Sequence, residues 1–186
     1  MKFSIFNLQF SKKGGFTLVE TLVAISILSL SIAATFTAVQ NSLQNSNIAK
    51  DETVAFYLTQ EGMEFIKNIR DENALHSISG AGTNWLASLS SVPTDPCFFG
   101  KTCVIDSALK AVSSCSGGFG TCPVLNKDSS TLLFGYTSSW TPTNFKREIQ
   151  FQQVATDEVS VIISISWLNR GVPKSFQITE TLFNRQ

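Results

Sequence analysis

The chain has 186 residues, a length that suits one domain with an additional element. Its 14 basic and 14 acidic residues cancel, but residues 1–15 hold Lys2, Lys12 and Lys13 and no acid. The remainder is mildly acidic, which gives no support for broad binding to a nucleic-acid backbone, although these totals would hide a local basic patch.

An apolar run, FTLVETLVAISILSLSIAATFTAV, fills residues 16–39 with one charge, Glu20, and no proline. A helix of this length is about 36 Å long and crosses a bilayer core of about 30 Å. An ordinary secretory signal is shorter and has a small-residue cleavage site on its far side. The run therefore predicts a transmembrane helix over residues 16–40. Because the basic flank precedes it, residues 1–15 are expected in the cytoplasm and the later chain outside.

On hydropathy alone, a plain signal anchor is the simplest interpretation, and Glu20 argues against it. A carboxylate inside an apolar run costs on the order of 2–3 kcal/mol at mid-membrane, so it indicates a functional partner. The sequence places no Lys or Arg at that depth. A cut between Gly15 and Phe16 would create a positive charge there, the new α-amino group, four residues before Glu20.

The stretch Lys12-Lys13-Gly14-Gly15-Phe16-Thr17-Leu18-Val19-Glu20 resembles the class III leader junction of type IV pilins and secretion-system pseudopilins. In that family a prepilin peptidase cuts after the glycine that matches Gly15 and N-methylates the next residue, here Phe16. The glutamate that matches Glu20 helps to dock an incoming subunit against the terminal amine of a neighbour. Many major pilins carry a helix proline that this chain lacks, and residues 19–25 resemble minor pilins and minor pseudopilins.

After the apolar run, helical spacing resumes, and we predict that residues 41–73 continue the helix as an amphipathic segment, loosened near Gln40–Asn47 and Gly62. Glu64 and Lys67 are spaced for a weak ion pair. The apolar stripe is expected to pack against the head domain; its members are Ala55, Leu58, Gly62, Ile66 and Ile69.

Residues 74–130 are predicted as a variable connection that contains six glycines, many serines and all four cysteines, Cys97, Cys103, Cys115 and Cys122. An even count of clustered cysteines indicates two disulfides in an oxidising compartment, with three possible pairings. Zinc is disfavoured because five and six residues separate the neighbouring cysteines, rather than two to four. Residues 85–89 are expected to pack a short helical or strand element on the core.

Residues 131–186 are predicted to form the antiparallel β-sheet of the head, since apolar and polar side chains alternate along residues 145–154, 159–168 and 175–183. A fourth strand is expected at Leu132–Tyr136. Short turns imply a meander with one face on the helix. The predicted fold class is α+β: a long N-terminal helix, half transmembrane and half amphipathic, packed on a C-terminal antiparallel sheet, as the pilin resemblance also implies.

No catalytic constellation is evident, so we predict no enzyme, cofactor or metal. His76 is the only histidine and is expected on the surface after the helix. Gly117–Gly120 is glycine-rich but lacks the lysine of a phosphate loop, and the serines lack a nucleophile-elbow pattern. No aspartate spacing matches a calcium loop.

The resemblance implies a structural subunit, a minor pilin or pseudopilin of a type IV pilus-like or type II secretion filament. Its partners would be other pilin subunits, prepilin peptidase, an inner-membrane assembly platform and, before assembly, membrane lipid. It would be a single-pass inner-membrane protein with its head outside, then part of a surface or periplasmic filament. One alternative is a tip-located adhesin or DNA-capture pilin binding through residues 97–122, and another is a membrane-anchored hydrolase. Binding and activity assays on the isolated head, residues 74–186, would distinguish these alternatives.

Overall fold

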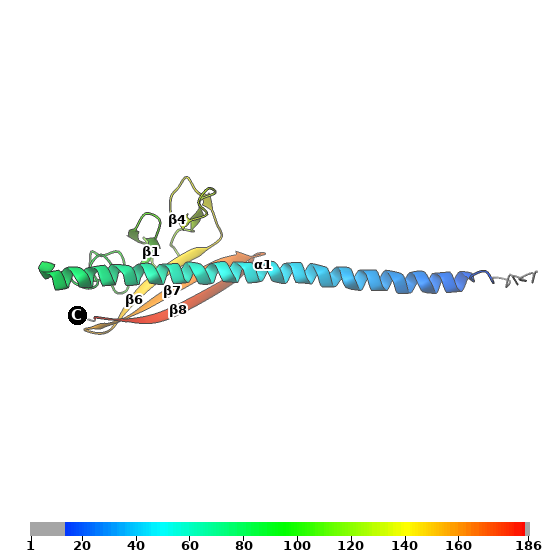
Figure 1. Cartoon of the computed structure of the whole chain (residues 1–186), viewed down its shortest axis with the longest axis horizontal. Coiled ribbons are helices and arrows are strands. Elements are labelled where there is room, and N and C mark those ends of the chain that lie inside the picture. The colour runs from blue at the N-terminus through cyan, green and yellow to red at the C-terminus, as the bar shows by residue number, and fades with distance from the viewer. Residues whose placement is uncertain (1–13, 185–186) are drawn as a thin grey trace, which may run out of the picture. The chain divides into compact units, whose positions relative to one another are not determined.

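The computed structural model describes residues 14–184 of the chain, so the predicted leader residues Lys2, Lys12 and Lys13 lie outside the described part. The chain forms two compact units, Met1–Asn47 and Ile48–Gln186, each described here by itself. The elements in chain order are α1 (Leu18–His76), the short π-helix η1 (Ser77–Ala81), β1 (Thr102–Asp106), β2 (Ala111–Ser114), β3 (Asn126–Lys127), β4 (Phe134–Gly135), β5 (Thr141–Pro142), β6 (Lys146–Ala155), β7 (Glu158–Asn169) and β8 (Val172–Phe183) (Figure 1). The predicted α+β fold class is confirmed.

Helix α1 is unbroken, so the loosening predicted at Gln40–Asn47 and at Gly62 was wrong. A polar stretch removes the apolar periodicity but not the tendency to form a helix, which explains the first error. Gly62 faces the sheet: a Cβ atom there would lie 3.4 Å from both Arg147 Cδ and Ile163 Cδ1, at the near limit of ordinary van der Waals contact. The helix ends at His76, which is exposed and belongs to its last turn.

The main sheet has five strands in the order β2-β1-β6-β7-β8, and all neighbours are antiparallel. The predicted meander over β6, β7 and β8 is confirmed. The strand predicted at Leu132–Tyr136 was wrong in its extent, because only β4 is extended there, in a separate three-stranded sheet of order β4-β3-β5. Strands β1 and β2 were missed. Both lie within the range predicted as a loop.

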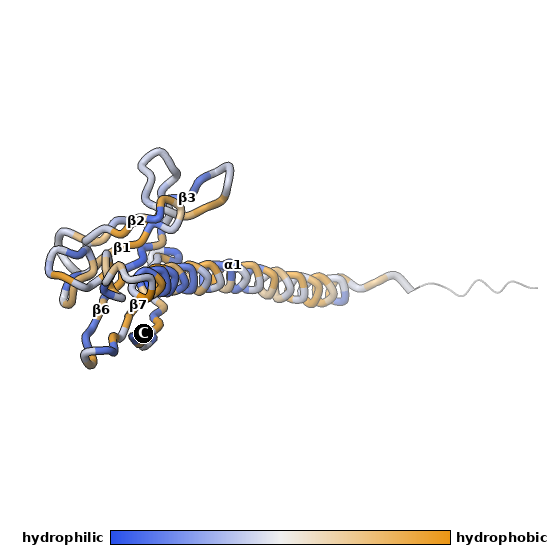
Figure 2. Tube along the Cα trace, turned by 60° about the vertical axis from the view of Figure 1, so that its left-hand side comes forward, coloured by the Kyte–Doolittle hydropathy of each residue, from blue (hydrophilic) through white to orange (hydrophobic). Residues whose placement is uncertain are grey.

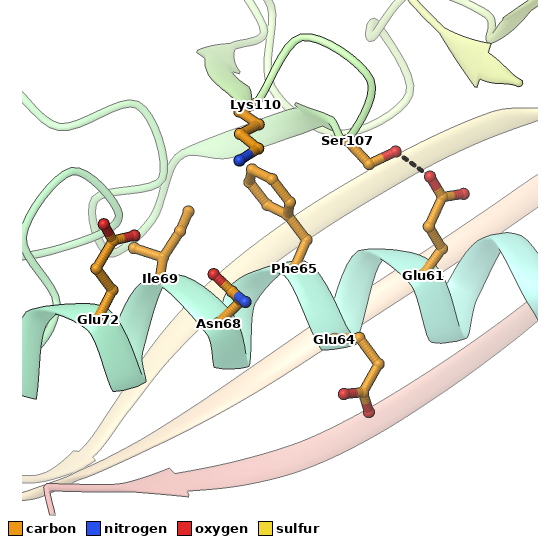
Figure 3. Close-up of a pocket in the computed structure, with 8 residues that line it drawn as sticks. All are labelled: Glu61, Glu64, Phe65, Asn68, Ile69, Glu72, Ser107 and Lys110. Carbon is orange, nitrogen blue, oxygen red and sulfur yellow. Dashed lines mark hydrogen bonds between the residues drawn. The ribbon is translucent and has the colours of Figure 1, made fainter.

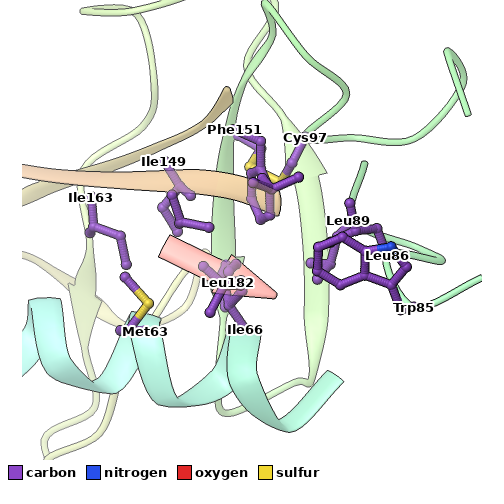
Figure 4. Packing of buried hydrophobic residues seen from close by; sticks show 14 residues of the cluster. Met63, Ile66, Trp85, Leu86, Leu89, Cys97, Ile149, Phe151, Ile163 and Leu182 are labelled. Carbon is purple, nitrogen blue, oxygen red and sulfur yellow. A yellow bond between two sulfur atoms is a disulfide. The ribbon is translucent and has the colours of Figure 1, made fainter. Parts of the chain in front are cut away.

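The core lies between α1 and the inner face of the main sheet. On β7 every second residue from Val159 to Trp167 is buried, as the alternation predicted. Figure 4 shows Met63 pointing from α1 toward Ile163, and Ile66 lying beside Leu182. A series of turns, rather than a helix or strand, brings Trp85, Leu86 and Leu89 onto the same cluster. Burying each large apolar side chain contributes roughly 1.5–3 kcal/mol, so this cluster is a major source of stability.

A fully buried arginine joins the helix to the sheet. Arg147, on β6, has no exposed surface. Its Nη1 donates to the carbonyl oxygen of Leu58 at 2.7 Å, and its Nη2 donates to the carbonyl oxygen of Ile105 at 2.6 Å. A carboxylate oxygen of Glu61 lies 3.6 Å from Nη1. A buried cation persists only when it is paired and hydrogen-bonded. These three contacts serve Nη1 and Nη2, whereas Nε is buried with no hydrogen-bond partner among the described residues.

Lys67 ties α1 to β8. Its Nζ lies 3.6 Å from Glu64, the predicted helical pair, but 2.8 Å from Glu180. The hydrogen bond to Glu180 is the largest cause of a raised pKa of Lys67. The interaction that matters most therefore crosses from the helix to the sheet, which the helical spacing alone did not indicate.

The carboxylate of Asp128 organises the turn that follows β3. It accepts hydrogen bonds from the hydroxyl and backbone N–H groups of Thr131 and Ser130. These bonds, led by the Thr131 hydroxyl, lower the pKa of Asp128 from 3.8 to about 2. The folded pKa lies below the unfolded value, so the turn is fully stabilised above about pH 4 and loses that stabilisation as the pH falls through 2.

We therefore expect the amide resonances of Ser130 and Thr131 to titrate with a midpoint near pH 2 in an NMR pH series. A midpoint near 3.8 for the Asp128 turn would show that these hydrogen bonds do not form in solution.

Candidate functional site

The residues on both sides of the predicted cleavage point are open to solvent. Gly14 to Thr17 have no regular secondary structure, and all are exposed. A Cβ atom built on either Gly14 or Gly15 would meet no atom within 4 Å. Phe16 is 80% exposed. Within the described part of the chain, an enzyme can reach the Gly15–Phe16 bond without unfolding anything.

Thr17 caps the start of α1. The backbone N–H of Glu20 donates to Thr17 Oγ1 at 3.2 Å, and the N–H of Thr21 donates to the Thr17 carbonyl oxygen at 3.1 Å. A Thr followed three residues later by a Glu is the sequence pattern of a capping box, a signal that the sequence analysis missed. None of the ion pairs among residues 14–184 involves Glu20. Its charge is thus left without a cationic partner in this part of the chain.

The first part of α1 exposes apolar side chains on all sides. It is the only helix among the described residues that is long and apolar enough to cross a membrane, and none of its apolar window is buried. Figure 2 shows apolar residues along this part of the helix. Hydroxyl groups within it are satisfied locally, since Ser26 and Ser31 donate to carbonyl oxygens one turn earlier, each at 2.8 Å. The segment therefore suits an apolar environment.

The cysteines pair as Cys97–Cys103 and Cys115–Cys122, one of the three arrangements that the sequence left open. Each disulfide closes a ring of the chain, the first at Cys97–Cys103 and the second at Cys115–Cys122. The two rings have different surroundings. Cys97 and Cys103 belong to the core, and β1, which begins beside Cys103, is buried throughout. The range 97–122 also contains strands β1 and β2, and its exposed aromatic side chain, Phe119, lies in the second ring.

The second ring is held in place by a buried carboxylate. Glu148, only 4% exposed, accepts hydrogen bonds from the N–H groups of Gly120 at 2.7 Å and Cys122 at 3.3 Å. Lys146 Nζ donates to the Gly120 carbonyl oxygen at 2.8 Å. Together with the disulfide, these bonds give the glycine-rich segment a defined backbone, so Gly117–Gly120 is a structured loop.

An open groove of about 430 Å³ lies between α1 and the turn that joins β1 to β2 (Figure 3). Phe65 and Ile69 line it, and Lys110 reaches over Phe65. Ser107 donates a hydrogen bond to Glu61, the carboxylate that also faces Arg147. These polar contacts hold α1 against the β1–β2 turn and β6. Among residues 14–184, no three His, Cys, Asp or Glu side chains converge to hold a metal ion.

Comparison with known proteins adds one match. The family model of the prokaryotic N-terminal methylation motif matches residues 10–36, which include the Gly15–Phe16 junction, Glu20 and most of the apolar segment. No curated protein and no solved structure matches the chain. The match thus covers the leader junction and the start of α1, and the head is described by its structure alone.

Proposed function

We propose that this chain, which carries a type IV pilin-like leader of the kind that prepilin peptidase processes, is a minor subunit of a type IV pilus-like or type II secretion filament. Cleavage would fall after Gly15, methylation would fall on Phe16, and assembly would proceed through the first part of α1. The observation that carries the proposal is the methylation motif on a helix whose apolar side chains are left unburied by the described residues, 14–184.

The exposed apolar segment supports assembly as the role of α1. Before assembly the lipid bilayer would cover it, and the apolar helix fits anchoring in the inner membrane. In a filament the same surface would pack against equivalent segments of other subunits. Lipid is already apolar, so burial alone does not drive the transfer, and close packing and polar contacts must select the correct neighbour.

Glu20 would supply that selectivity. It lies in the first turn of α1, and cleavage after Gly15 would make Phe16 the new N-terminus four residues earlier. In an apolar bundle, the carboxylate of one subunit would pair with the terminal amine of a neighbour, which removes two unpaired charges at once. The motif class is structural, so the chemistry would be done to this protein by its peptidase and not by the protein itself.

The decisive test is intact mass spectrometry of the protein purified from its native host. We expect the mass of residues 16–186 plus one methyl group, and a Gly15→Leu variant should keep residues 1–15 almost completely, because a branched side chain would crowd the peptide bond that the peptidase must reach. Gly14→Ala is the matched control, and we expect it to mature. A wild-type protein that retains its leader, or a Gly15→Leu variant that matures normally, would refute the proposal.

A further inference from the structure

The β7–β8 turn lies at the end of the head where α1 enters it. Strand β7 runs back along the helix, since its first half shares a buried cluster with Met63 and its second half shares one with Leu58. At the end of the strand, Asn169 Nδ2 donates to Asp51 Oδ2 at 3.3 Å. The turn that follows, Arg170-Gly171, therefore lies beside the first helical residues of the compact unit that contains the head.

The three long strands of the main sheet carry opposite charges at their two ends. Arg147 and Glu148 are buried and belong to the core contacts described above. In the register of the sheet, every other cation of β6, β7, β8 and their turns lies toward the β7–β8 turn, and every other acid lies toward the opposite end. The sheet therefore has a basic end and an acidic end. The cations are Lys146, Arg170 and Lys174, and the acids are Asp157, Glu158 and Glu180.

The cations at the basic end are free of acidic partners. None of the ion pairs among residues 14–184 involves Arg170, Lys174 or the nearby helix residue Lys50, and all three side chains are exposed. Two carboxylates lie at the same end, Asp51, which accepts the hydrogen bond from β7, and Glu52. Together with the lysine that begins β6, the three cations outnumber these acids, so this end has an excess of positive charge.

Exposed apolar side chains flank the same turn. Leu168 and Val172 lie on either side of it, and each is 56% exposed. Apolar side chains beside cations suit the interface of a bilayer, where the apolar groups enter the headgroup boundary and the cations are attracted to anionic lipids. The turn therefore offers both kinds of contact that a lipid surface accepts.

The chain keeps this end of the head close to the bilayer in which the proposed function places the apolar run. Residues 40–47 belong to α1 and join that run to the compact unit, and at about 1.5 Å per residue they span about 12 Å. The headgroup layer fills about 5 Å or more of this length. The remaining distance is comparable with the electrostatic screening length, which is about 8 Å at physiological ionic strength. The basic end is thus within electrostatic reach of an anionic lipid surface.

We infer that the β7–β8 turn docks on the anionic lipid headgroups of the membrane that holds α1. Arg170 and Lys174 donate hydrogen bonds to phosphate oxygens, and Lys50 adds its charge from the helix. Leu168 and Val172 enter the headgroup boundary. The acidic end of the sheet is then directed away from the negative surface, so docking orients the head before assembly. This inference rests on the membrane anchoring that belongs to the proposed function.

The acidic end of a second copy is the competing partner for these cations. Strand β7 has twelve residues, so its two ends lie about 40 Å apart. Two copies held at the same depth by their apolar runs also hold their β7–β8 turns at the same depth, with each acidic end at the far end of its strands. Before assembly, the surface that each copy brings to its own turn is therefore lipid.

The test uses the full chain in lipid nanodiscs that carry a gadolinium chelate on a lipid headgroup, which broadens the amide resonances of nearby residues. The discs contain phosphatidylcholine alone, or phosphatidylcholine mixed with phosphatidylglycerol. We expect the Gly171 amide to broaden about threefold or more in the anionic discs relative to the neutral ones, and the Asp157 amide to stay unchanged. Salt at about 1 M should remove the difference, because the screening length falls to about 3 Å.

Charge reversal at the turn has a matched control in the same fold. Arg170 and Lys110 both occupy exposed hairpin turns with positive φ, 51° and 52°. Arg170→Glu changes the charge at the lipid surface by two units and should lower the docked population about tenfold or more. Lys110→Glu makes the same change in the β1–β2 turn, and the broadening at Gly171 should not change. Arg170→Lys keeps the charge and should dock.

Recovery of the chain with the nanodiscs on gel filtration separates this inference from the proposed function. A chain that does not insert would overturn the anchoring and the docking together. An inserted chain whose Gly171 amide broadens equally in neutral and anionic discs, or equally in Arg170→Glu and wild type, would overturn the docking alone. Gly171 resonance shifts that grow with the number of chains per disc would also overturn it, because the occupant would then be a second copy.

Discussion

Replacing Arg147 with alanine is expected to destabilise the head by about 3–5 kcal/mol. The guanidinium is fully buried and donates to carbonyl oxygens on α1 and on β1, 2.7 and 2.6 Å away. Its removal leaves a cavity and breaks the polar link between helix and sheet. It also takes away the cation that faces the Glu61 carboxylate. These losses act at one position, so we expect the largest stability effect of any single polar substitution in the head.

Urea unfolding followed by tryptophan fluorescence measures this effect, because Trp85 and Trp167 are buried in the core. Arg147→Lys keeps the charge but cannot reach two carbonyl oxygens with a planar fork, so an intermediate loss is expected. Arg170→Ala, in the exposed β7–β8 turn, is the matched control and should lie within about 0.5 kcal/mol of wild type. A loss below about 1 kcal/mol for Arg147→Ala would show that the buried contacts contribute little.

Replacing Glu20 with glutamine is expected to reduce incorporation into filaments at least about tenfold while leaving cleavage after Gly15 intact. The amide is nearly the same size as the carboxylate but cannot neutralise a terminal amine in an apolar bundle, where an unpaired charge is costly. Glutamine also serves at the third position of a capping box, so the helix start at Thr17 is preserved. A loss of incorporation in this variant would therefore come from the missing charge of Glu20 and not from a disturbed helix cap.

Quantitative immunoblots of sheared filaments and of membranes give the ratio of assembled to unassembled protein. Ser26→Ala is the control within the same segment, because the Ser26 hydroxyl only returns to the carbonyl oxygen of Leu22. We expect that control to assemble normally. If Glu20→Gln enters filaments as well as wild type does, the pairing of carboxylate and amine cannot be the selecting contact.

The elements with strong periodicity could be predicted from the sequence. Alternation located β6, β7 and β8 within a few residues, and the apolar run located the first part of α1. Strand β1 could not be found in this way, because all five of its residues are buried and no alternation remains. Strand β4 has two residues, too few for any pattern, and only tertiary contacts decide which sheet it joins.

The polar contacts that join the helix to the sheet or cap the helix are harder to recognise in the sequence than the strands are. Ile149 and Phe151 are buried on the inner face of β6, Phe145 is buried just before the strand, and Arg147 occupies the same face between them. A charged residue at a buried position of an alternating strand indicates a buried contact, although not its partner. The Thr17 cap likewise had a readable pattern, whereas the Lys67–Glu180 pair joins residues too far apart in sequence to be found without the fold.

Residues that contact each other in the head lie far apart along the chain, which determines when during synthesis the core can close. The hydrogen bond from Arg147 to Leu58 joins residues 89 positions apart, and β6, β7 and β8 of the main sheet come from the last forty or so residues. The buried face of the helix therefore stays uncovered until translation of the chain is nearly complete. Such late closure leaves apolar surface open to chaperones or to wrong neighbours until the last strands have been made.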